Sequence, residues 1–308
     1  MSEKKRKKNN NENNKKKKKK KKKEEPSKIV ATFNDASTFK LIITSINDLA
    51  KDIPIRCDEE GIHITSMDSA HVCVIKLTVK GSSLESYRID KPMTFALNTS
   101  ILKKILNGVD KNYSLSLEYT DGSDEIDICI TNKTDKNDEK TYSIKEIDLD
   151  VDDLEAPTME YSHVYSMTSI EFKSMCSNQG SMGESTEMCS IDDVLHIKVV
   201  GDDASVLSRP KAVRIINDKP VETRELSKLN KSDVNKYFNT HRNECISCAS
   251  KYLAYFSKAC GVSEWCRISM LVNNDGPVQI YFPLKNDLGH ITYYLAPKLR
   301  DDDYDDDN

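Results

Sequence analysis

The sequence has no run of about 20 apolar residues, the length that crosses a bilayer as a helix. Its Lys- and Asn-rich start also lacks the apolar core of a secretory signal. We therefore expect no membrane association and an intracellular, reducing setting. The nine cysteines are irregularly spaced, which favours buried free thiols. The CxxC of Cys245 and Cys248 has no second cysteine pair and no suitably spaced histidines, so no metal site is predicted.

Common catalytic patterns are missing as well. Neither the phosphate-binding GxxxxGK(S/T) loop nor the zinc-protease HExxH is present. Asp68 and His71 lie near Ser66 and Ser69, but alternation along a strand points such side chains to different faces, and no glycine elbow accompanies them. The Asp-rich segment 148–153 lacks a second group of metal ligands. We expect no enzymatic activity and no cofactor. An enzyme, for example a carboxylate-dependent nuclease, ranks third, after the two alternatives given below.

Charge is strongly polarised along the chain. Residues 1–25 hold Arg6 and thirteen lysines against four glutamates, a net +10, whereas the whole chain carries −4. The rest therefore carries −14, with six of these charges in the terminal run 301–307. Such segments bury too little apolar surface to fold, so we predict a disordered basic tail at 1–27 and an acidic tail at 301–308. Compositional bias, a nuclear-import signal and a DNA-attracting arm all stay open for the basic tail.

Between the tails, the order of predicted elements repeats. Segment 37–51 has apolar residues at helical spacing behind Ser37, a plausible N-cap. Further helices are predicted at 101–109, from 168 to about 179, and at 250–260, with short alternating strands between them. This pattern is typical of α+β domains with antiparallel sheets and two helices each.

The predicted helices carry lysine away from their apolar stripes, although the body of the chain is acidic. Taken singly, each helix fits ordinary solvated lysines. Gathered on one helical layer, these lysines indicate a surface that faces phosphate groups.

Three segments resemble the proliferating cell nuclear antigen (PCNA) family of DNA sliding clamps. Ser66–Leu77 (SMDSAHVCVIKL) and Leu288–Leu299 (LGHITYYLAPKL) resemble its partner-docking face, and Tyr142–Tyr161 (YSIKEIDLDVDDLEAPTMEY) resembles its acidic connector. The resemblance spans residues 29–300. It implies the DNA-clamp fold, with two tandem similar domains at 28–147 and 162–300 and an extended connector at 148–161. The polar segment 217–243 exceeds the corresponding loop of the family and is predicted to be a surface insertion.

In the family, three copies form a ring whose helices line a central hole and touch the DNA backbone loosely through basic side chains. The residues predicted to face DNA here are Lys40, Lys51, Lys103, Lys104, Lys173, Lys251 and Lys258. Asn47, Asn107, Ser174 and Ser177 stand where members often have Lys or Arg. The resemblance therefore implies a less positive hole than usual, for which the basic tail would compensate.

The resemblance also implies an apolar pocket for the PIP-box, a short helical plug with a Gln anchor, an aliphatic residue and two aromatics. Its predicted lining is Met67, His71, Val72, Leu154, Ala156, Pro157, Pro277, Tyr294, Ala296 and Pro297. Ala156 replaces a larger aliphatic residue, which implies a roomier pocket. The implied partners are double-stranded DNA, DNA polymerase, a clamp-loader ATPase and PIP-box proteins such as a flap endonuclease and a ligase.

Ring closure is expected through paired strand edges. The strand of Tyr142 matches the family's interface edge, and we predict that it pairs with Val213–Ile216, placing Val213 and Ile215 at the contact of a homotrimer. One alternative is a checkpoint-type or virus-type factor that forms no such ring. Another is an interaction scaffold that keeps the pocket but binds DNA weakly. The expected location is the nucleus, or a cytoplasmic replication site if the protein is viral.

Overall fold

The computed structural model describes residues 26–149, 154, 159–179, 182–221, 229–271 and 276–298. Residues 1–25 of the predicted basic tail and the predicted acidic tail at 301–308 lie outside this set, as do Ala156 and Pro157. The predicted domain and connector boundaries stay predictions.

The two halves share one order of elements, into which the second half inserts β15 and α4. The first half runs β1 (Lys28–Phe33), α1 (Ala36–Ile46), β2 (Asp52–Cys57), β3 (Gly61–Met67), β4 (Cys73–Lys80), β5 (Ser86–Ile89), β6 (Met93–Asn98), α2 (Thr99–Ile105), β7 (Tyr113–Thr120), β8 (Glu125–Asn132) and β9 (Glu139–Lys145). The second runs β10 (His163–Thr168), α3 (Ser169–Gln179), β11 (Ser185–Ile191), β12 (Val194–Val200), β13 (Ser205–Ser208), β14 (Val213–Ile216), β15 (Lys219–Pro220), α4 (Lys231–Thr240), β16 (Ile246–Ala249), α5 (Ser250–Phe256), β17 (Trp265–Met270), β18 (Val278–Leu284) and β19 (Gly289–Leu295).

Local capping sets the helix starts. Asp35, and not the predicted Ser37, caps α1, because its carboxylate accepts a 2.9 Å hydrogen bond from the Ser37 amide. The Asn98 side chain caps α2 and accepts from the amides of Ser100 and Ile101. Helix α5 passes into a 3₁₀ turn at Ser257–Gly261. Helices α2 and α5 therefore both end four residues earlier than the apolar spacing predicts.

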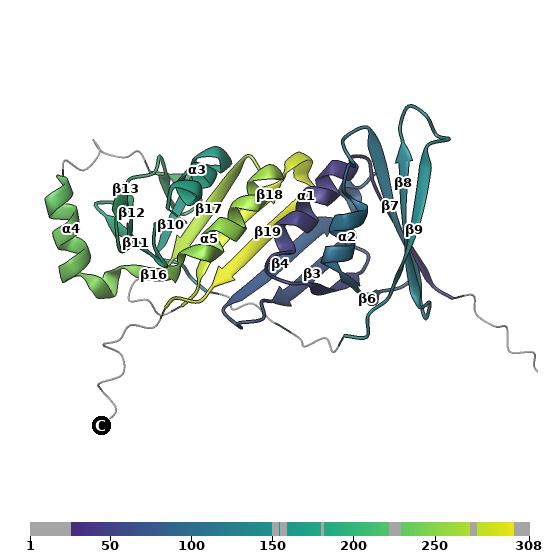
Figure 1. Ribbon diagram of the computed structural model, residues 1–308, viewed down its shortest axis with the longest axis horizontal. Helices are drawn as coiled ribbons and strands as arrows, with labels where there is room; N and C mark the ends of the chain where they lie inside the picture. Colours follow the sequence, from purple (N-terminus) through teal and green to yellow (C-terminus); the bar gives the residue numbers. More distant parts are fainter. Residues whose placement is uncertain are drawn as a thin grey trace, which may run out of the picture.

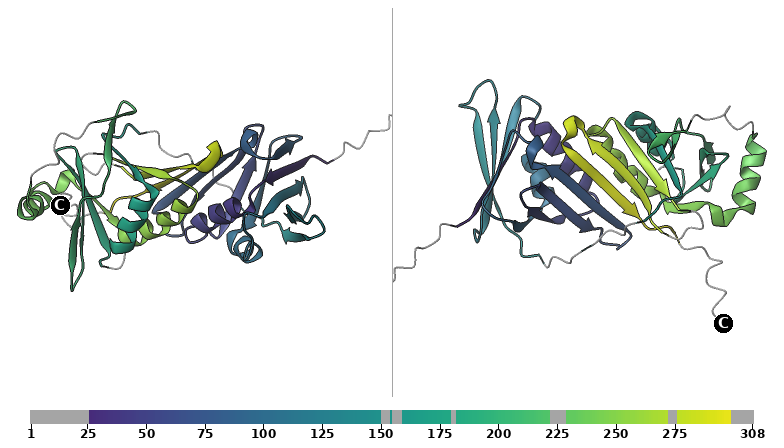
Figure 2. Two further views of the ribbon diagram at one scale, coloured as in Figure 1. Left: turned by 90° about the horizontal axis from the view of Figure 1, so that it is seen from above. Right: turned by 180° about the vertical axis from the view of Figure 1, so that it is seen from behind.

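The strands form three antiparallel sheets. Their orders are β5-β1-β7-β8-β9, then β15-β14-β10-β17-β18-β19-β4-β3-β2-β6, and finally β13-β12-β11-β16. The ten-stranded sheet joins the two halves through β19 and β4, whose register runs from Gly289 opposite Val79 to Leu295 opposite Cys73. Helices α1, α2, α3 and α5 lie together on one side of the sheets, in the row seen in Figure 1 and in the view from above in Figure 2.

A single apolar core runs through both halves. At the junction, the ring of Tyr293 stacks on Phe256 at 4.3 Å between centroids, and its hydroxyl donates to the Ser45 carbonyl oxygen at 3.2 Å. Tyr293 is fully buried. It therefore joins α5, α1 and β19 in one packed unit, which stabilises the seam between the halves.

The predicted surface insertion contains a helix that its sequence pattern did not predict. Helix α4 comes between β15 and β16, where the first half passes directly from β5 to β6. Its Val234 and Phe238 pack with Cys189, Ile191 and Cys245 in a small second core. Figure 1 shows α4 at the end of the molecule, apart from the other helices.

Candidate nucleic-acid and partner interfaces

Five of the seven predicted DNA-facing lysines are exposed, and four of these lie on the helices. Lys103 and Lys104 lie in α2, Lys173 in α3 and Lys251 in α5. The ammonium group of Lys251 also lies 5.1 Å from the ring centroid of Tyr252. The helices that carry these exposed side chains lie on one side of the sheets (Figure 1).

The other three lysines have partners within the chain. Lys40 donates to the Val109 carbonyl oxygen at 3.3 Å, and Lys51 donates to the Asn47 carbonyl oxygen at 2.7 Å. Lys258 forms an ion pair with Asp48. The Lys40 contact ties α1 to the chain after α2. The ion pair with Asp48 weakens the positive field of the layer, because it neutralises one charge.

Asn47 stands where members of the family often have Lys or Arg, but it does not face outward. It is 4% exposed, and its side-chain oxygen accepts hydrogen bonds from the hydroxyls of Thr99 and Ser100 at 3.2 and 3.1 Å. Both donors come from α2. A polar residue at this position therefore connects two helices and is not available for a phosphate.

Several of the predicted docking residues from distant segments lie close together. Met67 on β3 lies opposite Val74 on β4, and Val74 lies opposite Tyr294 on β19. The Ala296 amide donates to the Val72 carbonyl oxygen at 2.9 Å. Gln279 on β18 donates to the Tyr294 hydroxyl at 3.3 Å.

These contacts place the start of the 66–77 segment beside residues 294–296 on one outer face. His71 is exposed, with φ of 56°. Leu154, Pro277 and Pro297 are half-buried and Ala296 is exposed, whereas Ala156 and Pro157 lie outside the described residues. Beside this face lies a hollow of about 750 Å³ whose lining includes Met159, Tyr161 and Gln279.

Asp68 supports the loop that carries His71 and Val72. Its carboxylate accepts from the amides of Val72 and Cys73 at 2.8 and 2.6 Å and from the Tyr252 hydroxyl at 2.6 Å. Burial alone would raise the pKa of Asp68, but these hydrogen bonds outweigh it and hold the pKa below its ordinary value. The carboxylate is thus a structural anchor for the docking loop.

The structure corrects the predicted partner edge. Val213 and Ile215 lie on β14, which is paired on one side with β10 and on the other with β15, so Val213–Ile216 is not the last strand of its sheet. Among the described residues, β9 with Tyr142 and β13 each form one edge of the other two sheets, whose opposite edges are β5 and β16. The short β13 was missed in the sequence, although aligning the two halves would have revealed it as the counterpart of β4.

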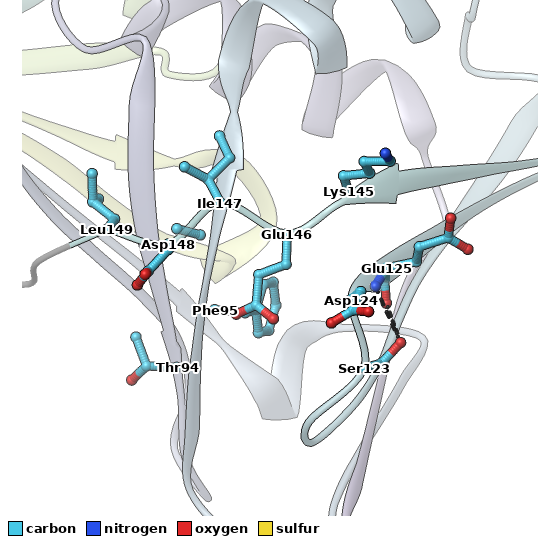
Figure 3. A pocket seen from close by; sticks show the side chains of 11 residues that line it. Thr94, Phe95, Ser123, Asp124, Glu125, Lys145, Glu146, Ile147, Asp148 and Leu149 are labelled. Carbon is cyan, nitrogen blue, oxygen red and sulfur yellow. Dashed lines mark hydrogen bonds between the residues drawn. The ribbon is translucent and has the colours of Figure 1, made fainter.

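A further cavity of about 890 Å³ opens between β6, the β7–β8 turn and the chain after β9 (Figure 3). Asp124, Glu125, Glu146 and Asp148 line it together with Lys145. Glu146 accepts from the Tyr119 hydroxyl at 2.8 Å; burial and this bond raise the pKa of Tyr119 to about 12. Within the described ranges, no three side chains of the metal-binding kinds are placed to hold an ion.

None of the helices in the described part of the chain is both long and apolar enough to span a membrane.

Comparison with known proteins agrees with the arrangement of two similar halves. The family model "Proliferating cell nuclear antigen, N-terminal domain" matches residues 29–153, and "Proliferating cell nuclear antigen, C-terminal domain" matches residues 155–298. A curated protein of Chaetomium thermophilum, named Proliferating cell nuclear antigen, is 26% identical over 274 residues, which cover 89% of this chain and 99% of the relative. The chain therefore belongs to the PCNA family of DNA sliding clamps.

Proposed function

We propose that three copies of this chain close into a ring around duplex DNA and tether replication and repair enzymes to it. The ring has no catalytic activity of its own. The observation that carries the proposal is the seam between the halves, where β19 of the second half pairs with β4 of the first. The same pairing between copies would join the outermost strands β9 and β13.

The repeat gives this contact a register. Tyr142 occupies the place of Tyr293, since each pairs with the equivalent residue of the preceding strand, Ile128 and Ile280. Val206 on β13 likewise occupies the place of Ile75 on β4. Each lies opposite the equivalent residue of the preceding strand, Val199 and Ser66. Tyr293 lies opposite Ile75, so Tyr142 is expected opposite Val206 of the next copy. This replaces the pairing with Val213–Ile216.

Apolar surface supports such a contact. A hollow of about 590 Å³ beside β9 is lined by Ile101, Ile105, Tyr142, Ile144 and Ile147 among others. Ile101 on α2 is 43% exposed, and Ile170 at the start of α3 is 83% exposed. Unpaired edges and exposed large apolar side chains mark surfaces that another chain covers.

In such a ring, the helical layer would face the DNA. Lys103, Lys104, Lys173 and Lys251 supply exposed positive charge, and lysine is a flexible point charge that does not read base edges. Diffuse phosphate attraction without base contacts allows a ring to slide. The partial neutralisation of Lys258 by Asp48 fits loose binding.

The outer face around Met67, Val72 and Tyr294 would receive the PIP-box of a DNA polymerase, a flap endonuclease or a ligase. Its apolar side chains and the neighbouring hollow of about 750 Å³ suit aromatic anchors. A clamp-loader ATPase would be needed to open the ring. The nucleus is the proposed location.

Two measurements test the proposal. Light scattering should give a mass three times that of the 35.0 kDa chain. After loading onto nicked circular DNA, the protein should be retained at low salt and released when the circle is linearised. A monomer in solution would favour the factor that forms no ring, and binding unaffected by linearisation would favour the scaffold.

A further inference from the structure

Two buried cysteines meet beneath the inserted helix α4. The Sγ atoms of Cys189 and Cys245 lie 2.7 Å apart. Both residues are 1% exposed, and both belong to the small core that α4 closes with Val234 and Phe238. Neither the docking face nor the helical layer uses this cluster.

Strand geometry already places the two residues for a covalent bond. Strand β11 pairs with β16 up to Met188 opposite Ile246, so the next opposed pair is Cys189 and Cys245. Opposed residues of antiparallel strands have Cα atoms about 4.5 to 5.5 Å apart, within the roughly 4.4 to 6.8 Å that disulfides span. Contracting the sulfur separation to the bonded length of about 2.05 Å needs only a small side-chain shift.

We propose that Cys189 and Cys245 form a reversible disulfide that fastens α4 to the face of the four-stranded sheet that it covers. The bond would link β11 to Cys245, which lies between the inserted segment and β16. It would also restrain the C-terminal end of α4. The carbonyl oxygen of His241, which directly follows α4, lies 3.4 Å from the Cys245 sulfur.

The bond forms by exchange with a small disulfide such as oxidised glutathione. One protein thiolate attacks the oxidant and releases one glutathione thiolate, which takes up the proton. The second protein thiol then attacks the mixed disulfide, gives up its proton and releases the second glutathione. The protein loses two hydrogens and two electrons, and the oxidant gains them.

Helix α4 controls access to this reaction. With both sulfurs buried, the oxidant reaches them only when α4 lifts from the sheet. The hydrogen bond from Cys245, together with burial, holds the pKa of Cys189 far above its ordinary value, so the unreactive thiol form dominates while α4 is closed. Cys248, three residues after Cys245, is buried in the main core and not under α4, so it is not an alternative partner.

The test uses the full chain treated with oxidised glutathione, with and without a low concentration of urea that loosens α4. Denaturation and alkylation should modify all nine cysteines of the reduced protein and two fewer after oxidation. Peptide mapping should place the link between Cys189 and Cys245, and urea should speed its formation. C245S and C189A should each abolish the link, whereas C129S, which removes a thiol on β8, should leave it intact.

A second readout addresses the fastening of α4. Trypsin should cut after Lys231, Lys236 and Arg242 about tenfold more slowly in the oxidised protein than in the reduced one, and C245S should show no such difference. Glutathione adducts without an internal link, or a link between other cysteines, would overturn the proposal. A correct link without slower cleavage would overturn the fastening of α4.

Discussion

The hydroxyl of Tyr252 on helix α5 donates a 2.6 Å hydrogen bond to the carboxylate of Asp68, 184 positions earlier in the chain. Asp68 anchors the docking loop on the outer face, and Tyr252 follows Lys251 on the helical layer. One hydrogen bond thus joins the two surfaces on which the proposed function depends. Because Asp68 is 6% exposed, the loss of its partner cannot be made good by bulk water.

Y252F should loosen the docking loop without removing any docking residue. Loss of a hydrogen bond to a buried carboxylate is expected to cost about 1 to 2 kcal/mol of unfolding free energy. Affinity for a PIP-box peptide should fall several-fold, as measured by calorimetry. Y255F on the same helix is the matched control and should bind normally; equal affinity for both variants would contradict the anchoring role.

The same carboxylate should give a pH signature. The pKa of Asp68 is lower in the folded protein than its ordinary value, so its stabilising contribution is present above the unfolded-state pKa, near 4, and is lost as pH falls through the folded-state value. The wild type should therefore be more stable than D68N at pH 7. This difference in unfolding free energy should shrink below about pH 4, and a difference that stays constant down to pH 3 would argue against an ionised anchor.

Sequence patterns predicted these surfaces unevenly. The 66–77 and 288–299 segments are each contiguous, so both parts of the proposed docking face could be predicted before the fold was known. The burial of Asn47 could not, because its partners Thr99 and Ser100 are about fifty residues away. Strand β13 was missed because its four residues, SVLS, give a weaker alternation than Val213–Ile216. Helix α4 lies in a polar segment, and of its ten residues only Val234 and Phe238 are buried.

The lysines should separate into two classes. K104A and K251A each remove an exposed charge, so each should make DNA retention less dependent on salt. The slope of log K against log salt should become shallower by about 0.9 for each phosphate that the variant no longer neutralises. K40A should instead lower the unfolding temperature, because it removes the hydrogen bond to Val109. K219A, on β15 outside the helical layer, is the control and should leave the salt slope unchanged.

The register proposed for ring closure places Glu139 of one copy opposite Arg209 of the next. His290 and Thr78, the residues at the equivalent positions, face each other at the seam within the chain. E139K and R209E should each weaken the trimer, and the double variant should recover about 0.2 to 1 kcal/mol per pair. Mass photometry at falling concentration measures this coupling. V213D on β14 should leave the trimer intact, and its dissociation would instead favour the edge first predicted.

The face under α4 should loosen in mild acid. His196 lies opposite Cys189 and is 1% exposed, and its Nε2 atom has no hydrogen-bond partner in the described structure. Burial, with a smaller effect of Arg209, lowers the pKa of His196, while the Val194 carbonyl oxygen and Asp192 act in the opposite direction. The unfolded state therefore takes up a proton below about pH 6.5 that the folded state resists, so stability falls as pH drops.

Hydrogen exchange of α4 peptides, corrected for intrinsic rates, should accordingly accelerate between pH 7 and pH 5.5. H196Q keeps a polar side chain of similar length but cannot take up this proton, so its exchange should not depend on pH in that window. Equal acceleration in both proteins would assign the effect to another group and leave His196 as a neutral packing residue.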